Sequence, residues 1–161
     1  MDNVKKKRIY LTDAQRGKFK REGTVSFLAR TSLNKGGAGA VICGEEYFIA
    51  ENYEEMGMNP QGEYGVEHKG WKDRSKVFPV HLRLRCRVVE CRVVELDSER
   101  VPVMSDAEWR SCGVDWIMEE GRRKFCRNYA KTVLRDDRRK VTGKALDESM
   151  VLIRVERVWR E

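Results

Sequence analysis

The chain has 161 residues, of which 40% are hydrophobic, and this length suits one domain with a substantial core. Charged residues make up 37% of the chain, and 33 Lys and Arg against 26 Asp and Glu give a formal net charge of +7. Such a balance favours a polyanionic partner, either nucleic acid or an acidic membrane surface. It also predicts no membrane-spanning segment, because no stretch approaches the roughly 20 consecutive apolar residues of a span.

The first residues and the cysteines predict a cytoplasmic protein. The start, MDNVKKKRIYL, lacks the apolar run of a signal peptide. The five cysteines are odd in number and none has CxxC spacing, which is typical of free thiols in a reducing compartment. Two histidines, His68 and His81, have no paired ligands beside them, so we expect no metal site and no cofactor.

In chain order, the first half of the sequence predicts one helix and two strands. Residues 1–8 are interpreted as a flexible basic N-terminus. Thr12 and Gln15 have the spacing of a capping box and Gly23 offers a stop, which predicts a helix over 13–22. Strands are predicted over 25–30 and 46–51, separated by the glycine-rich loop TSLNKGGAGA. Residues 52–76 lack periodicity, which is typical of a functional or mobile loop.

The second half predicts a long strand, two helices and a final strand. The strand covers 77–96, and slips of its alternation at Val88/Val89 and Val93/Val94 indicate bulges that bend it. A short helix is predicted after the cap Ser105, a longer one over 115–134, and a strand at VLIRVERVW. With no repeat and no linker, this order predicts a single α+β domain over 1–161 with a bent sheet.

The stretch VHLRLRCRV, residues 80–88, alternates apolar and polar side chains as a half-buried strand does. Its polar face carries His81 and the three arginines Arg83, Arg85 and Arg87. A guanidinium binds phosphate oxygens in two-point contact, and alternate residues of a strand stand about 6.6 Å apart, so such a row can follow a nucleotide backbone. The alternative is internal pairing across the sheet, for which several acids are available: Glu45, Glu46, Glu54, Glu90 and Glu95.

Four segments together resemble the ASCH domain, a member of the PUA-like group of small β-barrels. They are GEEYFIAEN, WKDRSKVFPVHLRLRCRVVECRVVEL, VPVMSDAEWRSCGV and VLIRVERV, and the second is similar to phage-type members of the family. The likeness covers residues 9–159, nearly the whole chain. It implies a small bent PUA-like β-barrel with short flanking helices, and a role in binding RNA.

The resemblance also implies a candidate catalytic residue, Glu51. Some ASCH proteins hydrolyse acetylated cytidine with a lysine, a threonine and a glutamate from a later strand, and Glu51 is the counterpart of that glutamate. The family signature Gly-x-Lys-x-x-Glu-x-Arg falls on GTVSFLAR, which keeps Gly23 and Arg30 but has Val25 in place of the lysine and Leu28 in place of the glutamate. Lys18, Lys20 or Arg21 fills that space only in another register.

Other interpretations of Glu51 stay open at this point. It could act as a general base or accept hydrogen bonds from the exocyclic amine of a base. It could also be a plain ion-pair partner of Arg30 or Arg85.

Two loops add aromatic and basic residues to the predicted interface. Trp71 lies beside Lys72, and a base that stacks on an aromatic ring gains about 1–3 kcal/mol. The alternative for Trp71 is that it closes the mouth of the barrel. Lys35 could meet a phosphate, although its loop lacks the GxxxxGK[ST] pattern of a P-loop. Trp109 is expected in the core, and Trp159 is expected to cap the sheet.

The leading hypothesis is a cytoplasmic module that binds RNA or a nucleotide. Its predicted interface consists of basic and aromatic residues: Arg30, Lys35, Trp71, Lys72, His81, Arg83, Arg85 and Arg87. The alternative is a small hydrolase that acts on a modified nucleoside or on RNA, with Glu51 as acid or base. A third hypothesis is an adaptor that binds another protein.

Overall fold

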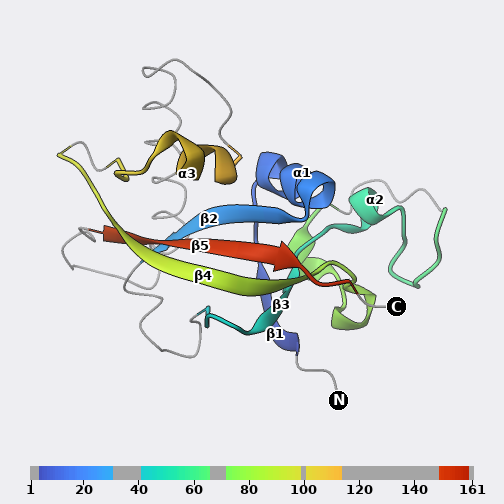
Figure 1. Cartoon of the computed structure of the whole chain (residues 1–161). Coiled ribbons are helices and arrows are strands. Elements are labelled where there is room, and N and C mark those ends of the chain that lie inside the picture. The colour runs from blue at the N-terminus through green and yellow to red at the C-terminus, as the bar shows by residue number, and fades with distance from the viewer. Residues whose placement is uncertain (1–3, 31–40, 66–71, 99–100, 114–148, 160–161) are drawn as a thin grey trace, which may run out of the picture.

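The computed structural model describes residues 4–30, 41–65, 72–98, 101–113 and 149–159 (Figure 1). The predicted helix over 115–134 lies outside these ranges, as do Lys35 and Trp71. None of the helices in the part of the chain that is described is long and apolar enough to cross a membrane.

The fold is a mixed α+β arrangement around one five-stranded sheet. Its strands are β1 (Val4–Ile9), β2 (Thr24–Arg30), β3 (Glu46–Ile49), β4 (Arg85–Glu95) and β5 (Ser149–Arg157). They lie in the order β1-β3-β4-β5-β2, with β1 and β3 parallel and the other neighbours antiparallel. Over the ranges given above the sheet is open, with β1 and β2 as its edges, so the predicted closed barrel is not confirmed.

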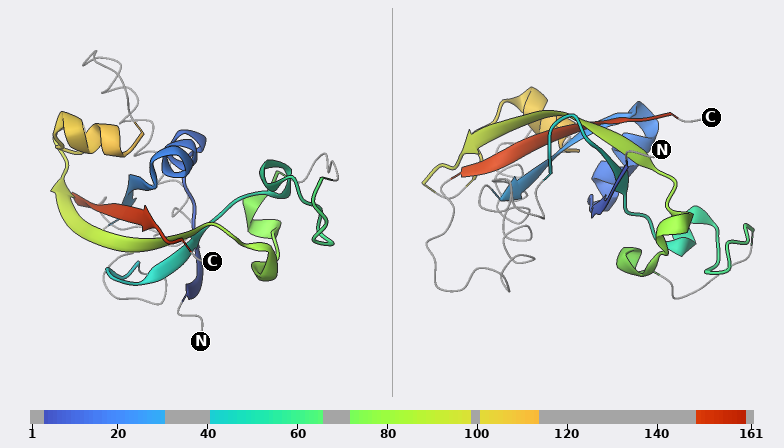
Figure 2. Two further views of the ribbon diagram at one scale, coloured as in Figure 1. Left: turned by 45° about the vertical axis from the view of Figure 1, so that its right-hand side comes forward. Right: turned by 90° about the horizontal axis from the view of Figure 1, so that it is seen from below.

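The predicted bend of the sheet is confirmed in β4. The register of β4 against β5 shifts between Val88 and Glu90, where the sequence indicates a bulge. Figure 2 shows that β4 curves along its length, as a bulged strand does. The second predicted slip, at Val93/Val94, is wrong, because pairing with β5 continues through both residues without a shift.

Local capping signals account for the helices. In α1 (Asp13–Glu22) Thr12 and Gln15 form the predicted capping box, and Gly23 ends the helix with a φ of 76°. In α3 (Asp106–Ser111) Ser105 and Glu108 form a second box. These two of the three predicted helices are therefore confirmed. A third, α2 (Tyr53–Met56), begins with the capping box of Asn52 and Glu55, inside a segment that was predicted to be a loop.

The core lies on both faces of the sheet, because neighbouring residues of a strand point to opposite sides. Phe27 and Ile153 pair across β2 and β5 and pack in one cluster with Phe19 of α1. The next pair, Leu28 and Leu152, packs in a second cluster that includes residues of α3. Trp109 belongs to this second cluster and is buried, as predicted.

Two further predictions from the sequence are wrong. The basic start is not a frayed end, because Val4–Ile9 forms a strand whose backbone pairs with β3. The long strand begins at Arg85 rather than at 77, because Pro79 starts a 3-10 turn over Pro79–His81. Val80 is consequently 84% exposed, whereas Leu82, Leu84, Cys86 and Val88 are buried, as the alternation predicts.

Candidate nucleic-acid interface

One end of the sheet brings several elements together, and we call it the site end. The register pairs Phe48 of β3 with Arg85 of β4, and Cys86 with Arg157 of β5. At the same end, the amide of Arg157 donates to the carbonyl of Gly23, the residue that ends α1. The end of β3, the start of β4, the end of β5 and the end of α1 therefore meet here.

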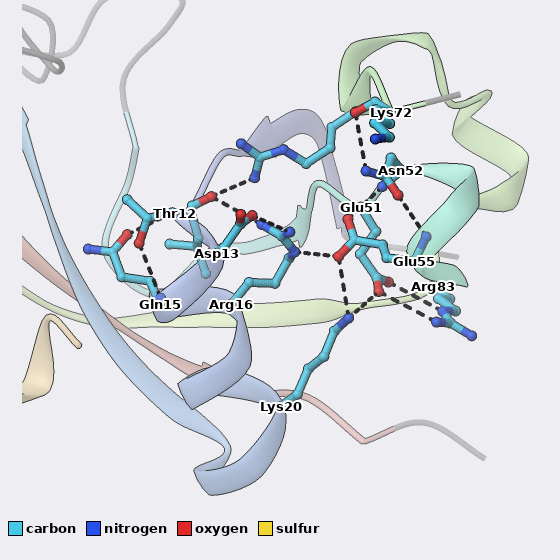
Figure 3. Close-up of polar contacts among 12 residues, drawn as sticks. Thr12, Asp13, Gln15, Arg16, Lys20, Glu51, Asn52, Glu55, Lys72 and Arg83 are labelled. Atoms are coloured by element: carbon cyan, nitrogen blue, oxygen red, sulfur yellow. Dashed lines mark hydrogen bonds and ion pairs between the residues drawn. The ribbon is translucent and has the colours of Figure 1, made fainter. Parts of the chain in front are cut away.

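Glu51 is the centre of a polar cluster at the site end. It follows β3 by two residues, and its side chain is only 1% exposed. Lys20 Nζ, from the last turn of α1, lies 2.7 Å from Oε2 of Glu51. Arg83, just before β4, donates from Nε to Oε1 at 3.3 Å and from Nη2 to Oε2 at 3.5 Å (Figure 3). The buried carboxylate is thus held between two cations.

A second carboxylate, Glu55, connects this cluster to the interior of the fold. Its Oε2 accepts a hydrogen bond from Arg16 Nε at 2.6 Å and lies 3.7 Å from Lys20 Nζ. Its Oε1 accepts from the amide of Asn52 at 2.7 Å, as part of the capping box of α2. The ion pair between Glu55 and Arg16 therefore links α2 to α1, and the amine of Lys20 lies between the carboxylates of Glu51 and Glu55.

Arg16 and Lys20 lie on one stripe of α1, because residues four apart on a helix face the same way. Arg16 is buried and also contacts Asp13 Oδ1 at 2.8 Å. The hydrogen bond from Arg16 and its charge lower the pKa of Asp13. Burial acts to lower the pKa of Arg83, but its hydrogen bonds and attraction to Glu51 outweigh that effect, and the net pKa is raised. The Asp13 carboxylate and the Arg83 guanidinium therefore both stay charged at neutral pH.

Arg85 and Arg87 share one face of β4, opposite Phe48 and Glu46 of β3, and Arg83 lies just before the strand. Arg87 donates to Glu46 Oε2 at 3.1 Å, and the guanidinium of Arg85 lies 5.2 Å from the ring centroid of Phe48. The predicted internal pairing is therefore found for Arg87 with Glu46, and Arg83 is also paired internally, but with Glu51, which was not among the acids predicted for it. The side chains of Arg83 and Arg87 remain about half exposed, at 45% and 53%, so both also face solvent.

His81 and Lys72 lie on the loops beside this cluster rather than on a strand. His81 ends the 3-10 turn, and its Nδ1 is 2.8 Å from the hydroxyl of Tyr53. That hydroxyl also accepts from the amide of Phe78 at 3.1 Å. Lys72 has an exposed side chain, and its carbonyl accepts a hydrogen bond from Asn52. His81 therefore packs against α2 instead of extending the row of arginines.

Arg30 is not brought to Glu51. Its backbone pairs with Met150 at one end of β2, whereas Thr24, at the other end, pairs with Glu156. Arg30 lies six positions after Thr24, which corresponds to about 20 Å along the strand. The backbone of Arg30 therefore lies at the end of β2 away from the site end, and Lys35 and Trp71 lie outside the residues described.

Sequence reasoning predicted Arg83 and Glu51 but missed the other members of the polar cluster around Glu51. Lys20 was considered only as a replacement for the family lysine, and Arg16 and Glu55 were not singled out. The spacing of Arg16 and Lys20, four residues apart with the buried Phe19 between them, does indicate that the two side chains lie on one side of the helix. Nothing in the local pattern indicates that this stripe faces Glu51.

A cleft of about 540 Å³ lies elsewhere, along another stripe of α1 and the end of α3. It is lined by small and charged residues that include Gly17, Arg21, Arg110 and Gly113, and not by Glu51. Within the described ranges, no group of three or more His, Cys, Asp or Glu side chains could hold a metal ion.

Comparison of the chain with known protein families, with curated proteins and with solved structures gave no match. The resemblance to the ASCH family therefore stays a prediction. The chemistry of the site end carries the functional argument.

Proposed function

We propose that the protein binds RNA or a nucleotide at the site end of the sheet. The observation that carries this proposal is the carboxylate of Glu51, 1% exposed, between Lys20 and Arg83, whose side chains are 35% and 45% exposed. A buried anion that orients two half-exposed cations pre-organises them, which lowers the entropy lost when they bind a phosphate. Arginine supplies the two-point geometry that phosphate oxygens favour.

This proposal revises the role of Glu51. A carboxylate that is almost fully buried and already accepts from Lys20 and Arg83 is poorly placed to meet the edge of a base. We assign it instead to positioning the two cations. The arginine row contributes through its exposed side, and the net charge of +7 attracts the polyanion from a distance.

The test is the binding of fluorescently labelled single-stranded RNA, measured by anisotropy over a series of salt concentrations. Arg83→Met should weaken binding by about tenfold and reduce the salt slope by about 0.7, the value for one lost phosphate contact on a single strand. Arg92→Met is the matched control, because Arg92 has the same 45% exposure and also pairs with a carboxylate, that of Glu108. Equal effects of the two variants would contradict a localised site.

A second candidate function rests on the 2.7 Å contact between Lys20 and Glu51. The ASCH resemblance implies an amidohydrolase that needs a lysine beside this glutamate, and Val25 stands at the lysine position of the predicted register. Lys20 could supply the missing amine. Water would then attack the acetyl carbonyl of acetylcytidine, and the products would be acetate and cytidine.

Turnover of acetylcytidine, followed by chromatography, tests this alternative. Activity that disappears in Lys20→Met and in Glu51→Gln but persists in Lys18→Met would support it, since Lys18 lies on the same helix and pairs with Glu22 instead. If acetylcytidine is not hydrolysed but RNA is bound, the hydrolase is excluded and the RNA-binding module remains as the proposed function. If the protein neither hydrolyses acetylcytidine nor binds RNA, the result favours the hypothesis of an adaptor that binds another protein.

The ASCH assignment, the PUA-like barrel and the cytoplasmic location belong to the same proposal. The order of elements supports it, because a helix, an arginine-bearing bent strand, a short capped helix and a closing strand follow one another as the resemblance implies. An experimental structure with a closed ring of paired strands would support the barrel. A sheet with two free edges along the complete chain would contradict it.

A further inference from the structure

Trp159 is the most exposed aromatic residue among those for which the structure describes a side chain. It follows β5 by two residues and is 75% exposed. The guanidinium carbon of Arg157 lies 3.9 Å from the centroid of its ring, the distance of a close cation–π stack. Burial of an indole is normally favourable, so an exposed one beside a cation is informative.

Backbone hydrogen bonds hold this stack at the site end. The amide of Val158 donates to the carbonyl of Arg85 at 3.1 Å, and the amide of Arg157 donates to the carbonyl of Gly23 at 2.8 Å. The segment that carries Trp159 is therefore tied on one side to β4 and on the other to the end of α1. Arg83 lies just before β4, and Lys20 lies in the last turn of α1.

The chemistry of the stack fits a nucleobase with its phosphate. An indole offers a flat apolar surface on which any base can stack, and a guanidinium beside it attracts the phosphate of the same nucleotide. Among the residues that are described, no carboxylate forms an ion pair with Arg157. Its charge is therefore neutralised less than that of Arg87, which pairs with Glu46.

We propose that Arg157 and Trp159 form the base-stacking platform of a site for single-stranded nucleic acid. One base lies on the indole of Trp159, and the neighbouring phosphates follow Arg157 and then Arg83 and Lys20 across the site end. This inference rests on the proposed function and extends it, because it names the residue that contacts a base. The predicted stacking residue was Trp71, which lies outside the described residues.

The experiment compares Trp159→Leu, Trp159→Phe and Arg157→Met with the wild-type chain. Affinity for a labelled uridine dodecamer is measured by anisotropy, and a thymidine dodecamer distinguishes RNA from DNA. We expect Trp159→Leu to weaken binding about tenfold, as the loss of one aromatic stacking contact does. The affinity of Trp159→Phe should lie between that of Trp159→Leu and that of the wild-type chain. Phe78→Leu is the matched control, since Phe78 is also an exposed aromatic but lies at the 3-10 turn.

Tryptophan fluorescence gives a second readout. Oligonucleotide should quench the emission of the wild-type chain, and the part of the quenching that comes from Trp159 should be absent in Trp159→Phe. Because Trp159 is largely exposed, its replacement should leave the thermal unfolding temperature within about 2 °C of wild type. The Phe variant keeps the test valid if the Leu variant does not fold.

The outcomes separate the platform from the function on which it rests. Wild-type affinity in Trp159→Leu together with weakened binding in Arg83→Met overturns the platform and leaves the proposed function intact. A wild-type chain that binds neither oligonucleotide overturns both. If Trp159→Leu instead abolishes binding to vesicles of phosphatidylserine and leaves oligonucleotide binding unchanged, the stack serves a membrane surface and the platform is wrong.

Discussion

The contact between Lys20 and Glu51 gives the most quantitative prediction. At a separation of 2.7 Å, Coulomb attraction is about 6 kcal/mol with an effective dielectric constant of about 20 and about 1.5 kcal/mol in water. Desolvation of the buried carboxylate offsets several kcal/mol of this attraction. Arg83 still contacts Glu51 when Lys20 is absent, so the carboxylate is not left alone. We therefore expect Lys20→Met to lower the free energy of unfolding by about 1–3 kcal/mol.

A double-mutant cycle isolates the pair. Lys20→Met, Glu51→Gln and the double variant are unfolded in urea at pH 7, and the coupling energy is expected to be about 1–2 kcal/mol. The matched control is the pair Lys18 and Glu22, which has the same 2.7 Å separation on the same helix but an acid that is 51% exposed rather than 1%. Its coupling should be about 0.3–0.5 kcal/mol.

The comparison decides whether burial strengthens the contact. If the coupling between Lys20 and Glu51 does not exceed that between Lys18 and Glu22, the reasoning about a buried, oriented carboxylate is refuted. A coupling that vanishes in about 1 M salt would also contradict it, because salt screens partly buried pairs much less than exposed ones.

Three smaller predictions concern thiols, acid and a helix end. Cys43 is exposed whereas burial raises the pKa of Cys86 to about 12, so iodoacetamide at pH 8 should alkylate Cys43 at least about tenfold faster, as mapped by mass spectrometry. The hydrogen bond from Arg16 lowers the pKa of Asp13 in the folded state, so this contact contributes above about pH 4 and is lost as the pH falls through that lowered pKa. Asp13→Asn should therefore cost about 0.2–1 kcal/mol in urea unfolding at pH 7 and less as the pH falls through the lowered pKa; a cost that does not change with pH would contradict the assignment. Gly23→Ala should lower the free energy of unfolding by about 1–2 kcal/mol because φ is 76°, and an unchanged urea midpoint would show that α1 does not end as described.

The helices α1 and α3 and the buried face of the segment 82–88 were determined by local sequence. A capping box needs only the spacing of Thr12 and Gln15, and the left-handed stop needs only Gly23, so α1 was predicted with its bounds. Alternation in VHLRLRCRV likewise identified the buried residues from Leu82 to Val88. These features depend on backbone geometry within one or two turns of chain, which a short pattern specifies.

The local sequence predicted the ends of the strands less well than it predicted the helices. The alternation alone extends the strand back to Val80, but Pro79 starts a 3-10 turn that leaves Val80 exposed. The basic segment Val4–Ile9 has no strand pattern of its own, and its backbone pairs with β3 as an edge strand. Edge strands depend on a neighbour for their hydrogen bonds, so their own side chains carry a weak signal.

The partners of each charged side chain were decided only by the tertiary structure. The sequence identified Glu51 and the arginine row, but it left open whether these groups meet a ligand or one another. Arg83 and Glu51 are separated by 32 positions, and Lys20 reaches Glu51 from α1. Ion pairs form wherever packing brings opposite charges within a few ångströms, and no local period encodes that distance. Trp159 was predicted to cap the sheet, and the structure shows it exposed beside Arg157 at the site end.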